Sequence, residues 1–212
     1  MDFLKLNENV SLTPTVKVGG IAVFKGFLPA TDQTRIVDDL RYVVAQAPTF
    51  SPKTRFGKKM SVKLTAAGEF GWFSDHQGYR YEKRHPTGVS WPEIPSSILS
   101  VWRSLAAHAP SPQCCLINYY EEGARMGMHQ DRDEASFDWP VVSISLGDDA
   151  LFRVGGQIKG GKTSSTWLQS GDVAVMGGDA RLNFHGIDRI KFKSSNLLKN
   201  GGRLNVTLRV VT

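Results

Sequence analysis

The chain has 212 residues, of which 41% are hydrophobic and 22% are charged, and its formal net charge is +6. This composition is typical of a folded globular protein and excludes an intrinsically disordered chain. No apolar run approaches the roughly 20 residues that a membrane-spanning helix needs, so we expect no membrane partner. The length fits one large domain, and we predict a single domain over residues 1–212.

The N-terminus and the cysteines indicate the compartment. The stretch MDFLKLNENVSLTP lacks the basic start and apolar segment of a secretory signal, so we expect a cytoplasmic location. The only two cysteines, Cys114 and Cys115, are adjacent within an apolar stretch. This arrangement favours buried reduced thiols over a disulfide framework or a zinc site.

The basic residues are unevenly distributed along the chain. Between Asp39 and Glu69 there are six Lys or Arg residues and no acidic residue, and after Asp188 the chain again carries only bases. Clustered bases with interleaved aromatic residues favour a polyanionic partner, because neutralising phosphates releases counterions. A basic surface that serves only solubility explains the same charges, and charge alone does not separate the two hypotheses.

The first half of the chain predicts two helices and a lid. Residues 30–47 carry apolar side chains at helical spacing, with Thr31 or Asp32 as the expected N-cap and Pro48 at the end. Residues 49–90 are rich in Gly, Lys and aromatic residues and predict long loops or hairpins over one end of the core, where functional lids tend to lie. Residues 96–109 predict a second helix that Pro110 ends.

From about residue 113 onward the pattern changes to short alternating segments separated by Gly and Asp. These segments are CCLINYY, VVSISL, ALFRVGG, SSTWLQ, VAVMGG and RLNVTLRVV. They predict a run of antiparallel strands. The simplest fold is α+β but mainly β. It has a jelly-roll core, also called a double-stranded β-helix, over residues 113–212, with the two helices packed outside.

The stretch MGMHQDRDEAS carries the first candidate metal ligands. In an extended segment residues two apart share a face, so His129 and Asp131 can reach one point, and Asp133 shares that parity. The His-x-Asp pattern is common by chance and also fits a solvated turn. His185, on the strand-like segment RLNFHGI, is a third candidate. Two histidines and one carboxylate with open positions form the facial triad that suits non-haem Fe(II).

The last strand-like segment, RLNVTLRV, has one wholly polar face. This face carries Arg203, Asn205, Thr207 and Arg209. A solvent-facing strand explains the alternation, but two guanidinium groups inside a barrel would be costly unless they held an anion. Arg203 and Arg209 lie about 20 Å apart when extended at ~3.3 Å per residue, which leaves room for a small dicarboxylate between their side chains. Asn118 and Tyr120 could add hydrogen bonds from a neighbouring strand.

Together, LINYY, MHQDRDE, VVSISLG, LFRVGG, GDVAVMGGDARLNFHGI and RLNVTLR closely resemble the bacterial AlkB-type Fe(II)/2-oxoglutarate dioxygenases. That family oxidatively demethylates alkylated bases in DNA and RNA. The resemblance runs from about residue 60 to the C-terminus, in the same order and at nearly the same spacing. It implies that the iron ligands are His129, Asp131 and His185. For 2-oxoglutarate it implies Asn118, Tyr120 and Arg203 at the distal carboxylate, and Arg209, with Asn205 on the same face, near the other carboxylate.

The segment GEFGWFSDHQGYRY matches the family's nucleotide-recognition stretch, which makes residues 49–90 a nucleotide-recognition lid. Trp72 and Tyr79 match the aromatic residues that line the damaged-base pocket, although aromatic residues at such positions also occur in protein cores. The resemblance implies that Asp133 contacts an exocyclic amino group of the base and that Ser143 lines the same cavity. Phosphate contacts that position the strand without reading its sequence are expected from Lys53, Arg55, Lys58 and Lys59.

Three residues depart from well-known relatives. Lys159, in the substrate-binding region, replaces an arginine, and Tyr119 replaces another arginine. Leu64 stands where a methionine often lies in the base pocket. The residues implied for iron and 2-oxoglutarate are unchanged, so these departures bear on the preferred substrate.

The resemblance predicts direct-reversal DNA repair by demethylation of N1-methyladenine and N3-methylcytosine. Fe(II), 2-oxoglutarate and O₂ are the expected cofactor and cosubstrates, and succinate, CO₂ and formaldehyde are the expected products. We expect a monomer. Its expected partner is alkylated DNA, single-stranded or duplex, with RNA as a further candidate, and single strands are expected to be preferred because extruding a base costs least there. Two alternatives stay open: a dioxygenase of the same fold that acts on RNA, a protein or a small molecule, and a non-catalytic nucleic-acid binder.

Overall fold

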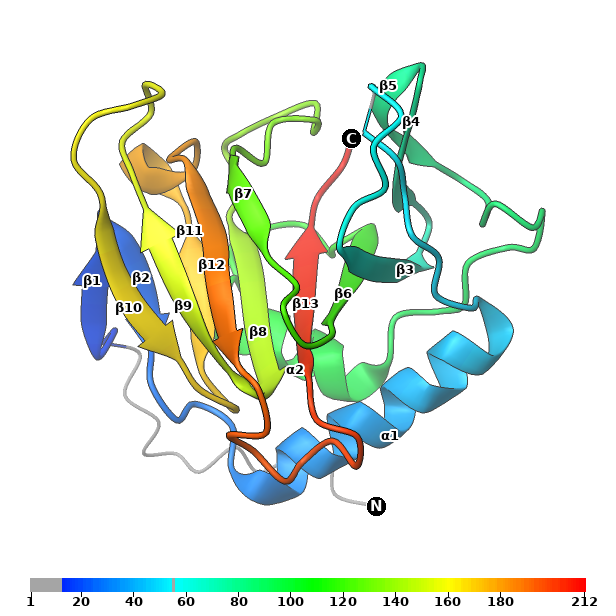
Figure 1. The fold of residues 1–212 in the computed structure, drawn as a ribbon, viewed down its shortest axis with the longest axis horizontal. Coiled ribbons are helices and arrows are strands. Elements are labelled where there is room, and N and C mark those ends of the chain that lie inside the picture. The colour runs from blue at the N-terminus through cyan, green and yellow to red at the C-terminus, as the bar shows by residue number, and fades with distance from the viewer. Residues whose placement is uncertain (1–12, 55) are drawn as a thin grey trace.

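Two antiparallel β-sheets face each other, and two helices pack on the other side of the larger sheet (Figure 1). The computed structural model describes residues 13–54 and 56–212. The helices are α1 (Ala30–Gln46) and α2 (Ser96–Leu105), and the short 3₁₀ helix η1 spans Gly178–Ala180. This arrangement confirms the predicted class, which is mainly β with two flanking helices.

The larger sheet has seven strands in the order β1-β2-β11-β8-β13-β6-β3. Their bounds are β1 (Val16–Val18), β2 (Ile21–Phe24), β3 (Val62–Gly68), β6 (Cys114–Tyr120), β8 (Val141–Gly147), β11 (Val173–Met176) and β13 (Arg203–Arg209). The smaller sheet has the order β10-β9-β12-β7. Its strands are β7 (Met126–His129), β9 (Asp149–Val154), β10 (Ser164–Leu168) and β12 (His185–Lys191). The separate hairpin of β4 (Gly71–Asp75) and β5 (Gly78–Glu82) stands beside one end of the sheets (Figure 1).

Strand β13 separates two environments, because it lies in the middle of the larger sheet between β8 and β6. Val206 and Leu208 belong to the apolar cluster that also contains the buried residues of α1 and α2. Arg203 and Arg209 lie on the opposite face and are buried as well. The polar face of RLNVTLRV therefore points into the protein interior, and the alternative of a solvent-facing strand is wrong.

The predicted helices form, but their ends differ from expectation. Helix α1 has Pro29 at its N-cap, without a capping side chain, so the expected cap at Thr31 or Asp32 is wrong. The Pro29 carbonyl accepts the first hydrogen bonds of the helix from backbone N–H groups, and its fixed φ suits a helix start. Helix α2 ends at Leu105, not at residue 109, because Ala106 leaves helical geometry and the chain turns before Pro110.

Several strands were not predicted. β1 and β2 extend one edge of the larger sheet, and β3 forms its other edge. β3 lies within residues 49–90, so the prediction of loops and hairpins there is wrong for Val62–Gly68 and confirmed for the hairpin of β4 and β5. β3 has the sequence VKLTAAG, and its two alanines and glycine are poor strand formers, so local propensity gives little sign of it.

Two expectations about the chemistry of the chain can be compared directly with the structure. Cys114 and Cys115 are buried and unbonded, as predicted, and burial raises the pKa of the Cys114 thiol to about 12. In the described part of the chain no helix combines the length and apolar character needed to cross a membrane. Residues 1–12, on which the expected absence of a secretory signal partly rests, and Arg55 of the lid lie outside the described residues.

The packing of α1 on the larger sheet can be tested with one substitution. Leu40 is 2% exposed and belongs to the cluster that joins α1 to the sheet. We expect Leu40→Ala to lower the free energy of unfolding by about 2 to 5 kcal/mol, because the mutation removes buried methyl groups and leaves a cavity. Tyr42 lies on the same helix and is 72% exposed, so Tyr42→Ala should change the free energy of unfolding by less than about 0.5 kcal/mol. Urea titration measures both, and equal effects would contradict this packing.

Candidate active site

A cavity of about 630 Å³ is lined by strands of both sheets and by the β4–β5 hairpin. The residues predicted for iron, 2-oxoglutarate and base binding all line it: Trp72, Tyr79, Asn118, Tyr120, His129, Asp131, Asp133, Ser143, Lys159, His185, Arg203, Asn205 and Arg209. Lys53, Lys58 and Lys59, predicted to contact phosphates, do not line it. Of the positions that depart from the family pattern, Leu64 also lines the cavity. Tyr119 does not, and its hydroxyl donates a hydrogen bond to the carbonyl of Gly201. The cavity thus collects residues from distant parts of the chain.

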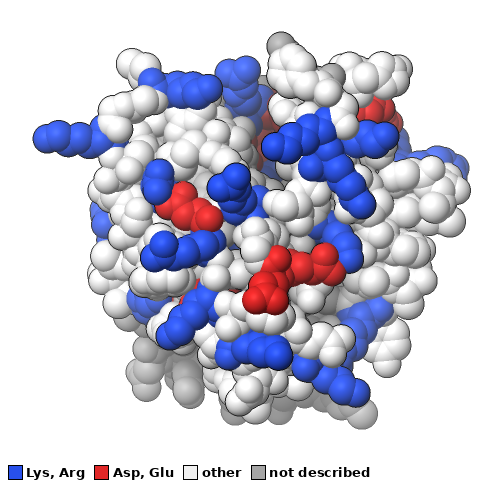
Figure 2. Space-filling model, in the orientation of Figure 1, with Lys and Arg blue, Asp and Glu red and all other residues white. Residues whose placement is uncertain are grey.

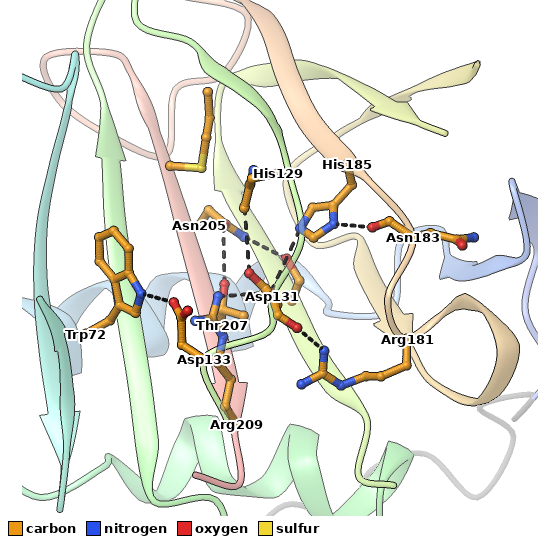
Figure 3. Close-up of polar contacts among 12 residues, drawn as sticks. Trp72, His129, Asp131, Asp133, Arg181, Asn183, His185, Asn205, Thr207 and Arg209 are labelled. Carbon is orange, nitrogen blue, oxygen red and sulfur yellow. Dashed lines mark hydrogen bonds and ion pairs between the residues drawn. The ribbon is translucent and has the colours of Figure 1, made fainter. Parts of the chain in front are cut away.

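Three candidate metal ligands lie close together at the C-terminal end of β7. Their ligand atoms all lie within 4.8 Å of one another, and no other group of three His, Cys, Asp or Glu residues in the described chain is arranged in this way. Asp131 Oδ1 lies 3.6 Å from His129 Nε2, and Asp131 Oδ2 lies 3.9 Å from His185 Nε2. Figure 3 shows both imidazoles directed toward the carboxylate.

The pairing of β7 with β12 brings the two histidines together. His185 is the direct partner of His129 in the ladder, and their ring centroids are 4.5 Å apart. Gly186 permits this close approach, because a Cβ atom there would lie only 2.6 Å from the carbonyl oxygen of Met126. Any side chain at this position would force the two strands apart.

Both imidazoles are oriented with one nitrogen toward the candidate metal position. The Nδ1 atoms of His129 and His185 lie 2.9 and 3.0 Å from the carbonyl oxygens of Gly127 and Asn183. A carbonyl only accepts hydrogen bonds, so each Nδ1 donates its proton, which leaves Nε2 as the ring nitrogen available to a metal. Burial lowers the pKa of His185 to about 4, so this ring is neutral at physiological pH.

The third candidate ligand is ionised. Burial alone would raise the pKa of Asp131, but the surrounding positive charges, of which Arg209 contributes most, together outweigh burial and keep that pKa well below its ordinary value. Arg209 Nη2 lies 2.9 Å from Asp131 Oδ2. Two imidazoles and one carboxylate form a donor set that fits Fe(II) and leaves coordination positions for other ligands.

A cationic cradle lies on β13 and β6, next to this donor set. Arg203 is buried and donates one hydrogen bond, from Nη2 to Ser145 Oγ at 3.0 Å. Its Nε and Nη1 atoms, and Oδ1 of Asn118, have no hydrogen-bond partner among the described residues. Burial lowers the pKa of Arg203, and its guanidinium group lies 5.2 Å from the ring of Tyr120. A buried cation with unpaired donors fits an anionic ligand that would satisfy them.

Polar side chains on β13 and β8 lie between the two arginines. Asn205 Nδ2 donates to Ser143 Oγ at 2.7 Å, and Thr207 Oγ1 donates to Asn205 Oδ1 at 3.3 Å. Asn205 and Thr207 stand between Arg203 and Arg209 on one face of β13, as the sequence pattern indicates. This face therefore offers hydrogen-bonding groups along the cavity wall between the two cationic ends.

The β4–β5 hairpin supplies aromatic residues to the outer part of the cavity. The rings of Trp72 and Tyr79 stack, with centroids 5.4 Å apart and an interplanar angle of 26°. Trp72 Nε1 donates to Asp133 Oδ2 at 2.8 Å, which joins the hairpin to the metal-ligand segment (Figure 3). Tyr79 is 51% exposed, so it is not a core residue. The pair forms a flat apolar surface at the cavity wall.

Exposed basic residues occur in the segment predicted to form the lid and at the cavity. Lys53, Lys58 and Lys59 of that segment are exposed, and so is Lys159, which lines the cavity. Lys and Arg outnumber Asp and Glu on the face seen in Figure 2. The uneven charge distribution along the chain therefore becomes a basic surface on the described part of the protein.

Three buried or partly buried residues near Asp131, which do not line the cavity, were not identified from the sequence. Tyr81, Glu134 and Arg181 form contacts behind Asp131, and Glu134 Oε2 lies 3.1 Å from Arg181 Nη2. Tyr81 could have been found from its spacing, because it lies two residues after Tyr79 on the same strand. Glu134 gives no such signal, because it directly follows Asp133 and its parity places it on the opposite face of an extended segment.

Comparisons with known proteins agree with this geometry. Residues 20–209 match the model of the 2OG-Fe(II) oxygenase superfamily. The chain is 49% identical over 197 residues to the "Alpha-ketoglutarate-dependent dioxygenase AlkB homolog" of Caulobacter vibrioides, covering 92% of this chain and 90% of that protein. It is 31% identical to the "DNA N(6)-methyladenine demethylase ALKBH1C" of Arabidopsis thaliana, covering 92% of this chain and 49% of that protein.

The fold agrees as well. The solved structure of OsALKBH1 superposes with a TM-score of 0.79 at 30% identity, covering 92% of this chain and 98% of that one. The predicted jelly-roll core is thereby confirmed, and so is the resemblance seen in the sequence motifs. The chain belongs to the 2OG-Fe(II) oxygenase superfamily and, within it, to the AlkB-type alpha-ketoglutarate-dependent dioxygenases, which use Fe(II), 2-oxoglutarate and O₂.

Proposed function

We propose that this enzyme demethylates alkylated nucleobases in DNA, with His129, Asp131 and His185 as the ligands of Fe(II). The observation that carries the proposal is the position of this donor set in one cavity, between a buried cation with unpaired donors and a stacked aromatic pair. The first feature suits 2-oxoglutarate and the second suits a base removed from its stack.

Fe(II), 2-oxoglutarate and O₂ supply the oxidation of the N-methyl carbon, and the products are succinate, CO₂, formaldehyde and the restored base. The protein orients the reactants and excludes water. Arg203 binds the distal carboxylate of 2-oxoglutarate through its unpaired Nε and Nη1 atoms, with Asn118 and Tyr120 beside it. Arg209 lies near the other carboxylate, on the side of the cavity that contains Asp131. Asn205, between the two arginines on the same strand face, completes this set.

The damaged base is placed against Trp72 and Tyr79, with the imidazole of His129 as the opposite wall. Aromatic surfaces replace the stacking energy that the base loses when it leaves the strand. Asp133 accepts a hydrogen bond from Trp72 through Oδ2. Its carboxylate also favours the cationic ring of N1-methyladenine or N3-methylcytosine and contacts an exocyclic amino group. Ser143 and Lys159 line the same cavity and contribute to substrate binding.

The nucleic acid lies across the lid. Exposed Lys53, Lys58 and Lys59 contact phosphates and position the strand without reading its sequence. Single-stranded DNA is the preferred form, because extrusion of a base costs least there.

Action on RNA, a monomeric state and a cytoplasmic location are further predictions. A non-catalytic binder is disfavoured, because the complete donor set and both buried arginines are present.

The iron assignment predicts the effect of His129→Ala. We expect formaldehyde release from N3-methylcytosine oligonucleotides to fall more than about 100-fold, because loss of a ligand exceeds the 10- to 100-fold cost of losing an outer partner. The visible charge-transfer band formed by anaerobic addition of Fe(II) and 2-oxoglutarate should also disappear. His108→Ala, at an exposed histidine that does not line the cavity, is the matched control and should retain both signals.

Equal turnover by His129→Ala would refute the iron assignment. Absence of the band in the unmodified protein would refute the dioxygenase reaction itself. The three candidate substrates are compared by measuring formaldehyde release from single-stranded DNA, duplex DNA and RNA that carry the same lesion. Fastest release from RNA would favour the alternative substrate class.

The base-pocket assignment predicts that Trp72→Ala weakens turnover of the damaged strand by about 5- to 150-fold in kcat/KM, which corresponds to one lost base stack. The affinity for 2-oxoglutarate, measured anaerobically by the same band, should stay nearly unchanged. Trp167→Ala removes a partly exposed tryptophan from β10, outside the cavity, and serves as the control. If 2-oxoglutarate binding collapsed in Trp72→Ala alone, Trp72 would be a structural residue of the site.

A further inference from the structure

The buried carboxylate of Glu134 lies on the far side of Arg181 and Arg209 from Asp131. The side chain of Glu134 is 0% exposed. Its Oε1 accepts a hydrogen bond from the hydroxyl of Tyr81 at 2.6 Å and lies 3.7 Å from Arg209 Nε. Its Oε2 lies 3.1 Å from Arg181 Nη2. Glu134 is therefore the common anionic partner of two buried arginines.

The same two arginines hold Asp131 at different atoms. Arg209 Nη2 lies 2.9 Å from the carboxylate oxygen Oδ2. Arg181 Nη1 donates to the backbone carbonyl of Asp131 at 2.6 Å, as Figure 3 shows. One guanidinium thus orients the side chain of Asp131, and the other fixes its main chain.

These contacts matter because Asp131 has no strand to support it. β7 ends at His129, and the residues from Gln130 to Asp133 are in neither a helix nor a strand. The position of Asp131 therefore depends on side-chain contacts from elsewhere in the fold. Two guanidinium groups buried around one carboxylate leave an excess positive charge, which a second carboxylate neutralises.

We propose that Glu134 is a positioning residue that holds Arg181 and Arg209 in place, so that Asp131 presents Oδ1 to the side of His129 and the metal. The proposal rests on the proposed ligand set. Tyr81 completes the arrangement, because its hydroxyl donates to Glu134 and accepts from Arg209 Nη1 at 3.1 Å. Since β5 carries both Tyr81 and Tyr79, this contact also connects the lid hairpin to the metal-ligand segment.

The test measures metal binding without turnover. Mn(II) binds to oxygen and imidazole donors, and its unbound fraction is counted by electron paramagnetic resonance in the absence of 2-oxoglutarate. Glu134→Gln keeps the shape of the side chain and removes its charge. We expect it to raise the Kd for Mn(II) about tenfold, in line with the usual cost of losing an outer partner of a metal ligand. Glu122→Gln, the same change at an exposed carboxylate outside the cavity, should leave the Kd unchanged.

Thermal unfolding of the metal-free variants separates positioning from general stability. A purely structural role would lower the unfolding temperature of Glu134→Gln and leave its Kd within about twofold of the unmodified protein, which would overturn the inference. If Glu134→Gln fails to fold, Tyr81→Phe decides: a Kd raised about threefold supports the inference, and an unchanged Kd overturns it. The proposed function fails separately, if the unmodified protein and His129→Ala bind Mn(II) equally.

Discussion

Burying charged side chains between two β-sheets is the constraint on which this active site depends. An ionised group inside a protein is costly unless opposite charges and hydrogen bonds surround it. The two arginines of β13 meet this constraint differently. Arg209 is paired with Asp131 and Glu134, whereas Arg203 keeps two donor atoms without a partner in the described chain. The charge of Arg209 is thus balanced by two carboxylates of the protein, whereas Arg203 has donor atoms that the proposed carboxylate of 2-oxoglutarate would satisfy.

The fold allows this arrangement because the two faces of the larger sheet are specialised. Its outer face is covered by α1 and α2 and forms the main apolar cluster, which stabilises the protein. Its inner face can then carry polar groups that would weaken a continuous core. The smaller sheet contributes the two histidines through the close pairing of β7 and β12, for which Gly186 leaves room. Stability and chemistry are thereby assigned to different surfaces of the same strands.

Sequence patterns predicted those helices and strands whose apolar and polar residues repeat at a regular spacing. The alternation in RLNVTLRV indicated a polar face, and helical spacing located α1 within one residue of its observed end. The family resemblance added the residues that line the cavity. What could not be predicted depends on long-range packing. β3 pairs with β6 despite weak strand propensity, and α1 begins at Ala30 after an N-cap proline that provides no capping side chain. Glu134 lies in an irregular segment, where residue parity does not say which side chains are buried.

The register of β13 has a consequence for how the enzyme folds. Residue by residue, this strand pairs with β6 on one side and β8 on the other. A slip of one residue would turn Val206 and Leu208 into the cavity and press Arg203 and Arg209 against the helices. Such a chain would lose its apolar cluster together with the polar cavity wall that β13 provides. The same register therefore determines both the stability of the fold and the polar lining of the cavity, so a slipped strand would lose the two together.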